Sequence, residues 1–137
     1  MNCIIAGLVA GVGAFFADYF MWSKVFMKGM EQYSTPVPPE QMKQVMAKNL
    51  PKSAVLALVF GLLLAWFYNR LKGGLWVTAG PLAGMEFATL LWLPTIALST
   101  IGGSVWYDKL RPIHRATLWS WLVRMNVAGL LVGAIVR

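Results

Sequence analysis

The sequence is poor in the residues that build metal sites and disulfides. Its 137 residues include one cysteine, one histidine and only five acidic residues. Because Cys3 is alone, neither an internal disulfide nor a cysteine metal site can form within one chain. His114 lies between Arg111 and Arg115, and these arginines disfavour a bound cation. We therefore expect no metal site.

Motifs of known enzyme classes are missing as well. The sequence contains no zinc-protease helix, nucleophile elbow or cysteine pair. Gly11 and Gly13 lie inside an apolar run and lack the glycine-rich phosphate-binding pattern. We expect no catalytic residue and no cofactor, so the leading hypothesis is a protein that is not an enzyme.

Hydrophobic residues, in contrast, are abundant. They make up 58% of the chain and charged residues only 12%, whereas a soluble domain is roughly half apolar and a quarter charged. A chain this short cannot bury so much apolar surface in water, so lipid must cover part of it. The net charge of +7 comes from basic residues beside apolar runs rather than from a basic stripe. This placement favours anionic lipid head groups over nucleic acid as the partner.

Four apolar runs predict membrane-spanning helices over residues 3–27, 53–68, 75–99 and 116–136, since about twenty apolar residues cross a bilayer. The later connections are short, which predicts antiparallel neighbours. The expected fold is all-α: one domain over residues 1–137, forming an integral membrane antiparallel four-helix bundle. Pro94 removes the helical donor for the carbonyl of Leu90, so we expect a kink or hinge there.

The connection between the first two runs carries its own pattern. Pro36, Pro38 and Pro39 interrupt the chain, and Pro39 suits the first turn of a new helix. Apolar residues then recur at helical spacing, at Met42, Val45, Met46 and Leu50. The pattern predicts a short amphipathic helix over residues 39–50. Two placements are open: on the membrane surface, or as a cap on the end of the bundle.

Basic residues in the connections predict the orientation. The first connection carries five lysines, and the third carries Lys109, Arg111 and Arg115. The opposite side has only Arg70, Lys72 and the terminal Arg137. We therefore expect both termini outside and the first and third connections in the cytoplasm.

Three pairs of glycines have the Gly-xxx-Gly spacing that lets helix backbones approach closely. They are Gly7 with Gly11, Gly80 with Gly84, and Gly129 with Gly133. We assign them first to packing within the bundle, and the alternative is a homo-oligomer that uses one such face.

Polar residues within the apolar runs are Asp18, Glu86, Arg124 and Asn126. With about 1.5 Å of rise per residue, the three charged ones can fall in one layer of the bundle. Because helical side chains lean towards their own amino terminus, Arg124 leans towards Asp18 and Glu86 leans away from Arg124. We expect a buried Asp18–Arg124 ion pair. Glu86 is then left with Asn126 or Thr89 as donors, and we expect it to be protonated, because burial favours the neutral carboxylic acid.

Intramembrane charges are functional candidates by default, because burying them costs free energy. Three roles remain open for this set. The charges can fix helix register, they can snorkel to an interface without pairing, or they can form a proton or solute site.

Two stretches resemble a family of small, four-span bacterial membrane proteins of unknown function. They are Phe20-Met21-Trp22-Ser23-Lys24-Val25-Phe26-Met27-Lys28-Gly29-Met30 and the glycine-containing Ala128-Gly129-Leu130-Leu131-Val132-Gly133-Ala134-Ile135. Met21 stands where that pattern has an aromatic residue, and Arg124 is not part of it. The resemblance implies a multi-pass protein of the bacterial inner membrane and implies no activity.

Two functions are therefore compared. The first is a non-enzymatic accessory or scaffold component that packs through glycine-rich faces against other membrane subunits or copies of itself. The alternative is a small oligomeric transporter or proton-coupled carrier that uses Asp18, Glu86 and Arg124, with Pro94 as the hinge. A lipid- or quinone-handling enzyme comes third.

Overall fold

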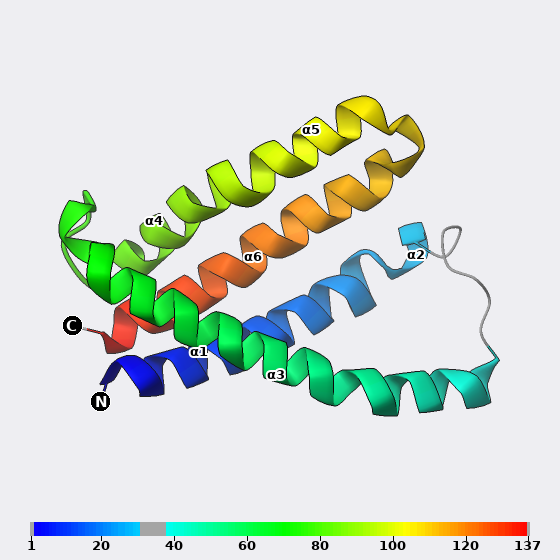
Figure 1. Ribbon diagram of the computed structural model, residues 1–137, viewed down its shortest axis with the longest axis horizontal. Coiled ribbons are helices and arrows are strands. Elements are labelled where there is room, and N and C mark those ends of the chain that lie inside the picture. The colour runs from blue at the N-terminus through cyan, green and yellow to red at the C-terminus, as the bar shows by residue number, and fades with distance from the viewer. Residues whose placement is uncertain (1, 31–37, 137) are drawn as a thin grey trace.

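The computed structural model describes residues 2–30 and 38–136, and this part of the chain is helical without a strand. Pro36 and Arg137 lie outside the described residues. The helices are α1 (Asn2–Phe20), α2 (Met27–Met30), α3 (Pro39–Leu71), α4 (Pro81–Trp92), α5 (Leu98–Trp106) and α6 (Arg111–Ile135) (Figure 1). A π-helical segment, Met21–Val25, extends α1, and a second, Leu93–Ala97, joins α4 to α5.

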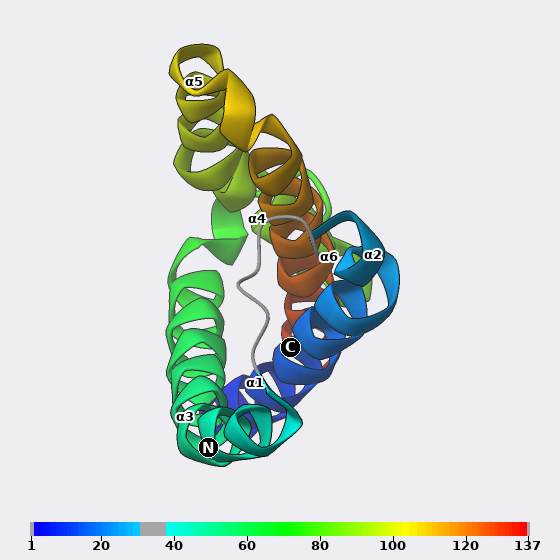
Figure 2. The ribbon, with the colours of Figure 1, turned by 90° about the vertical axis from the view of Figure 1, so that its right-hand side faces the viewer.

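The helices form an antiparallel bundle that is closed at one end and open at the other. Helix α1 packs along both α3 and α6, and α4 packs along α6, whereas α3 and α4 touch at few positions. Figure 2 shows α5 and the start of α3 on opposite sides of the molecule. The prediction of an all-α helical bundle is confirmed.

Four helical stretches of the described chain are long and apolar enough to cross a membrane: Asn2–Val25, Pro39–Gly74, Pro81–Trp106 and Arg111–Ile135. Each contains one of the four predicted apolar runs in whole or in large part. The last stretch begins five residues earlier than predicted, since Pro112 is compatible with a first helical turn.

The prediction of a separate short helix over residues 39–50 is wrong. Residues 39–71 form one continuous helix of 33 residues, with Pro51 inside it. Proline removes a single donor and costs about 3 kcal/mol in a helix interior. The neighbouring residues are mostly strong helix formers, and the chain continues through the proline rather than turning there.

The third predicted run is displaced along the chain. Residues 75–80 are not helical, because Gly80 adopts a positive φ of 87° and Pro81 then occupies the first turn of α4. At the other end the helix continues past residue 99 to Trp106. The expected disturbance at Pro94 takes the form of the π-helical segment, where the Thr95 hydroxyl donates to the carbonyl of Leu91 at 2.6 Å.

Small residues form the interior, and many large apolar residues lie on the surface. Seven alanines of the core have no exposed surface: Ala6, Ala10, Ala14, Ala65, Ala83, Ala88 and Ala128. Trp76 and Trp106, in contrast, are 86% and 83% exposed. This distribution reverses that of a protein folded in water, where large apolar side chains fill the core.

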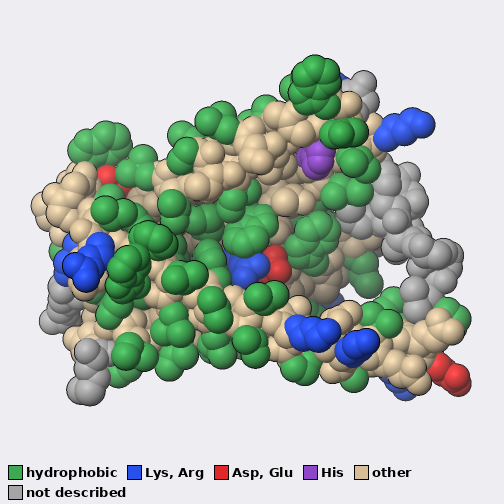
Figure 3. Space-filling model, viewed as in Figure 1, with side chains coloured by type: hydrophobic (Ala, Val, Ile, Leu, Met, Phe, Trp, Pro, Cys, Tyr) green, Lys and Arg blue, Asp and Glu red, His purple; other side chains and the backbone are tan. Residues whose placement is uncertain are grey.

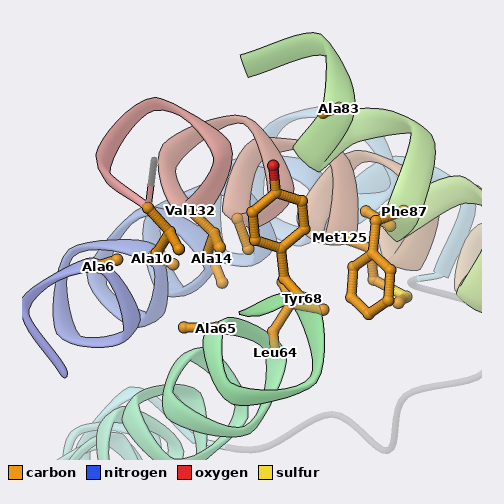
Figure 4. Packing of buried hydrophobic residues seen from close by; sticks show 13 residues of the cluster. Ala6, Ala10, Ala14, Leu64, Ala65, Tyr68, Ala83, Phe87, Met125 and Val132 are labelled. Atoms are coloured by element: carbon orange, nitrogen blue, oxygen red, sulfur yellow. The ribbon is translucent and has the colours of Figure 1, made fainter. Parts of the chain in front are cut away.

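Large side chains fill the closed end of the bundle. Tyr68 of α3, 1% exposed, lies between Val132 of α6 and Phe87 of α4 (Figure 4). The rings of Tyr68 and Phe87 meet edge to face at 5.7 Å between centroids. This contact ties α3 to α4 at the end where α3 finishes and α4 begins.

Glycines bring α1 and α3 into backbone contact. A Cβ added to Gly7 would lie 2.7 Å from the Cα of Leu62, and one added to Gly11 would lie 2.7 Å from the carbonyl oxygen of Ala57. A Cβ added to Gly61 of α3 would overlap the backbone of Gly7 and Gly11. The crossing therefore depends on three glycines, two from α1 and one from α3.

A second glycine crossing joins α4 to α6. A Cβ on Gly84 would overlap the carbonyl of Gly129, and one on Gly129 would overlap that of Gly84. A Cβ on Gly133 would overlap the carbonyl of Gly80. Gly80 itself has open space around its Cβ position, so its positive φ, rather than close packing, requires glycine there.

We predict that Gly84→Ala destabilises the folded chain by about 1–3 kcal/mol, because the new methyl group must push α4 away from α6. Gly102→Ala is the matched control, since a Cβ there meets nothing within 4 Å and alanine favours the helix. Unfolding followed by circular dichroism in mixed micelles measures both variants. Equal stability of the two would show that the crossing does not depend on backbone contact.

Candidate functional site

Asp18 and Arg124 are brought together at the junction of α1 and α6. The Arg124 Nη1 atom lies 3.6 Å from the Asp18 Oδ2 atom. The Ser120 hydroxyl, one turn before Arg124, donates to Asp18 Oδ1 at 3.3 Å. Both oxygens of the carboxylate thus face α6, and the predicted pairing is the one that the structure contains.

Two aromatic rings surround the Arg124 guanidinium. Its Cζ atom lies 4.5 Å from the ring centroid of Trp121 and 4.9 Å from that of Phe60 on α3, within the range of cation–π attraction. The two rings also contact each other edge to face at 5.8 Å. Arg124 therefore links three helices, α1 through Asp18, α6 through Trp121 and α3 through Phe60.

The prediction that this ion pair is buried is wrong. The Arg124 side chain is 13% exposed and that of Asp18 is 35% exposed. Asp18 is the more open partner, because its carboxylate borders a groove between α1 and α3. The guanidinium lies beside it and against the two rings. Its Nε atom is buried and has no hydrogen-bond partner.

The carboxylate of Asp18 borders a groove between α1 and α3. The groove has a volume of about 420 Å³ and is lined by Phe15, Asp18, Tyr19, Trp22, Ser23, Leu50, Ser53, Leu56, Ala57 and Arg124. Figure 3 shows a hollow in this face, where a basic and an acidic side chain lie side by side among hydrophobic ones. The Ser23 hydroxyl oxygen is buried without a partner. The groove thus combines an apolar lining with a few polar groups, as small-ligand and helix-binding grooves do.

Glu86 lies outside this groove and holds a different part of the chain. Its two carboxylate oxygens accept the backbone N–H groups of Trp76 and Val77, each at 2.8 Å. The side chain leans towards the start of α4, in the direction expected from helix geometry. The prediction of Asn126 and Thr89 as donors is wrong, and the carboxyl oxygens of Glu86 accept from two backbone amides instead.

Asn126 and Thr89 instead bond to each other across α4 and α6. The Thr89 hydroxyl donates to Asn126 Oδ1 at 3.1 Å, and Asn126 Nδ2 donates to the carbonyl of Leu122 at 2.9 Å. Nearby, the indole N–H of Trp92 donates to the carbonyl of Leu118 at 3.3 Å. These bonds lie along the same pair of helices as the Gly84–Gly129 contact.

Sequence reasoning did not identify Ser120, Trp121 and Phe60 around the ion pair. It also did not identify Gly61 in the crossing of α1 and α3. Ser120 and Trp121 precede Arg124 by four and three residues, so helical spacing places them on its face and could have identified them. Gly61 belongs to the small-residue series Ala57, Gly61 and Ala65, which a search for glycine pairs alone overlooks. No comparable signal identifies Phe60.

Among the described residues, no group of three or more His, Cys, Asp or Glu side chains could hold a metal ion. Cys3 is half-buried near the start of α1, and His114 lies near the start of α6. The sequence matches no model of a protein family, no curated protein and no solved structure.

We predict that Asp18→Asn and Arg124→Met each lower the free energy of unfolding, and that the double variant loses less than the sum. Either single change leaves one charge without its partner, so a coupling of about 1 kcal/mol is expected for groups in direct contact. Circular dichroism in mixed micelles measures the cycle. Arg70→Gln, which removes an exposed cation over Trp66, is the control. Strictly additive losses would contradict the pairing.

We predict that Glu86→Gln destabilises the turn before α4, because an amide offers one oxygen where two N–H groups need acceptors. The expected loss is about 1 kcal/mol, the usual net contribution of one hydrogen bond. Hydrogen exchange at Trp76 and Val77 should accelerate. Glu40→Gln, in the first turn of α3, should leave both amides unchanged, and so should Glu86→Gln if these bonds are unimportant.

Proposed function

We propose that the chain is a multi-pass protein of a bacterial inner membrane, crossing it at the four apolar helical stretches. Its exposed surface supports this proposal, because large apolar side chains cover it and alanine and glycine fill the interior. In lipid, helices associate through close backbone packing of small residues. The two glycine crossings are contacts of that kind.

The distribution of basic residues supports an orientation with both termini outside. The start of α3 carries Lys43, Lys48 and Lys52, and the turn between α5 and α6 carries Lys109 and Arg111. These segments lie at the same end of the antiparallel bundle (Figure 1). By the preference of positive charge for the cytoplasm, this end faces inwards. The start of α3 then lies at the inner membrane surface as the first turns of a long helix.

Within the membrane, the proposed role is that of a non-enzymatic accessory or scaffold component. The observation that carries this proposal is the use of the charged groups: Glu86 holds the turn before α4, while Asp18 and Arg124 hold α1, α3 and α6 together. Each of these charges performs an architectural task inside the chain.

The partner surface in this proposal is the groove between α1 and α3. The glycines of both crossings are occupied within the chain, so a partner has to bind elsewhere. Lipid chains cannot form a hydrogen bond with the Ser23 hydroxyl or with the exposed side of Asp18. A transmembrane helix that carries a polar side chain can do so, while it covers Tyr19, Trp22 and Leu56.

We predict that a photoreactive amino acid at Leu56 cross-links the chain to one protein of defined mass. Leu82 is the matched control, since both positions are 67% exposed but Leu82 lies on α4, away from the groove. The experiment uses intact membranes, followed by purification in mild detergent. A partner of the chain's own mass identifies a homo-oligomer, and another mass identifies a different subunit. Adducts with lipid alone at both positions, together with a lone monomer, would contradict the role.

The alternative, a small carrier, is favoured by one observation: Asp18 is open to the groove while it faces Arg124. Glu86 lies outside the groove, so only Asp18 and Arg124 remain as charged residues that a carrier could use there. Substrate-dependent or proton-dependent flux in proteoliposomes, lost in Asp18→Asn, would favour the carrier over the scaffold.

A further inference from the structure

The groove between α1 and α3 contains polar atoms whose hydrogen bonds the chain leaves unmade. The Ser23 hydroxyl oxygen is buried without a partner, and so is the Nε atom of Arg124, which also lines the groove. Asp18 faces Arg124 with one carboxylate oxygen and accepts from Ser120 with the other, whereas an ionised carboxylate has room for about four hydrogen bonds. Burying such groups without partners costs free energy. The groove therefore offers free donors and a free acceptor beside its apolar lining.

Ser23 differs in this respect from hydroxyl residues elsewhere in the described helices. A helical Ser or Thr commonly donates to a carbonyl about one turn earlier in its own helix. Thr95 donates in this way to the carbonyl of Leu91, and Ser104 donates to that of Ile101. The Ser23 hydroxyl makes no such bond and stays available to a ligand.

The turn that carries Ser23 is itself irregular. Residues Met21–Val25 form a π-helical turn, and the N–H of Phe26 donates to the carbonyl of Met21 at 3.0 Å. The second π-helical segment contains Pro94, but this one contains no proline that would account for it. Single π turns occur frequently at functional sites. The irregular turn therefore supports this side of α1 as a binding surface.

The charges in the groove favour a neutral ligand group. Among the described residues that line it, only Asp18 and Arg124 are charged, and they lie 3.6 Å apart. Because their charges offset each other, a lysine or an acidic side chain brought into the groove would add a net charge inside the membrane, which is costly. A lipid chain adds no charge but forms no hydrogen bond. A neutral group that both donates and accepts meets both conditions.

A side-chain carboxamide is such a group. It carries two N–H donors and a carbonyl oxygen that accepts, so it can donate to Asp18 and accept from the Ser23 hydroxyl or from Arg124 Nε. Asn and Gln side chains also join transmembrane helices through hydrogen bonds of this kind. We propose that the groove binds a transmembrane helix of the partner through an Asn or Gln side chain. This inference rests on the proposed scaffold function and names the chemistry by which the partner is recognised.

The test uses the purified full-length chain in mixed micelles, with synthetic transmembrane peptides of leucine as probes. The peptides differ at one position, which is Leu, Asn, Lys or Asp, and energy transfer from the seven tryptophans to a dansyl group on the peptide measures binding. The Asn peptide should bind about tenfold more tightly than the Leu peptide, the effect of one interhelical hydrogen bond. Equal binding of these two peptides would overturn the proposal, and so would tighter binding of the Lys or Asp peptide.

Variants of the chain locate the preference in the groove. Asp18→Asn should remove the preference for the Asn peptide, and Ser23→Ala should reduce it without touching the ion pair. Ser99→Ala removes an exposed hydroxyl from α5, outside the groove, and should leave the preference unchanged. Circular dichroism checks that each variant keeps its helices. A preference that survives in both groove variants would overturn the proposal.

The peptide experiment and the cross-linking experiment at Leu56 fail separately. A preference for the Asn peptide without a protein cross-link in membranes would support the chemistry of the groove and contradict the scaffold role. A protein cross-link without this preference would support the scaffold role and overturn recognition through a carboxamide.

Discussion

The close backbone contact between α4 and α6 at Gly84 and Gly129 is the constraint on which the rest of the structure depends. At this distance the helices pack with almost no side chain between them. Because the backbones of α4 and α6 lie so close together, Thr89 can reach Asn126 and the indole of Trp92 can reach the carbonyl of Leu118. The second crossing, at Gly7, Gly11 and Gly61, fixes α1 against α3 in the same way. Large side chains are then displaced to the outside, which is the arrangement that the proposed membrane location requires.

The charged residues act within this frame rather than creating it. Arg124 extends from α6 past α1 to a ring on α3, so it joins the helices that the Gly84 contact does not reach. The guanidinium is planar and delocalised, which lets it contact a carboxylate at its edge and aromatic rings at its faces. A lysine offers a point charge and would lose the stacked contacts. The chemistry of arginine therefore explains why this cation can lie among aromatic residues with only a loose ion pair.

The sequence predicts much of the architecture, and the errors have definite physical causes. Apolar runs predict the four long helices, and the lean of helical side chains predicts Asp18 as the partner of Arg124. The true donors to Glu86 escaped prediction because residues 75–80 were assigned to a helix, which would place the amides of Trp76 and Val77 about 14–15 Å along the helix axis from Glu86. In the structure, the positive φ of Gly80 separates residues 75–80 from α4, which begins at Pro81. Phe60 escaped prediction because its contact depends on the crossing angle of α3, which the chain does not encode locally.

The difference between the two ends of the bundle limits where a ligand or partner can bind. Tyr68, Phe87 and Val132 fill the end where α3 and α6 finish and α4 begins, so this end offers little internal space. At the opposite end α3 and α5 separate, because among the described residues no glycine crossing and no large buried ring joins them. The groove lies in this open half, between the parts of α1 and α3 beyond their glycine crossing. The glycine crossings therefore hold the fold together and also decide which half remains available for binding.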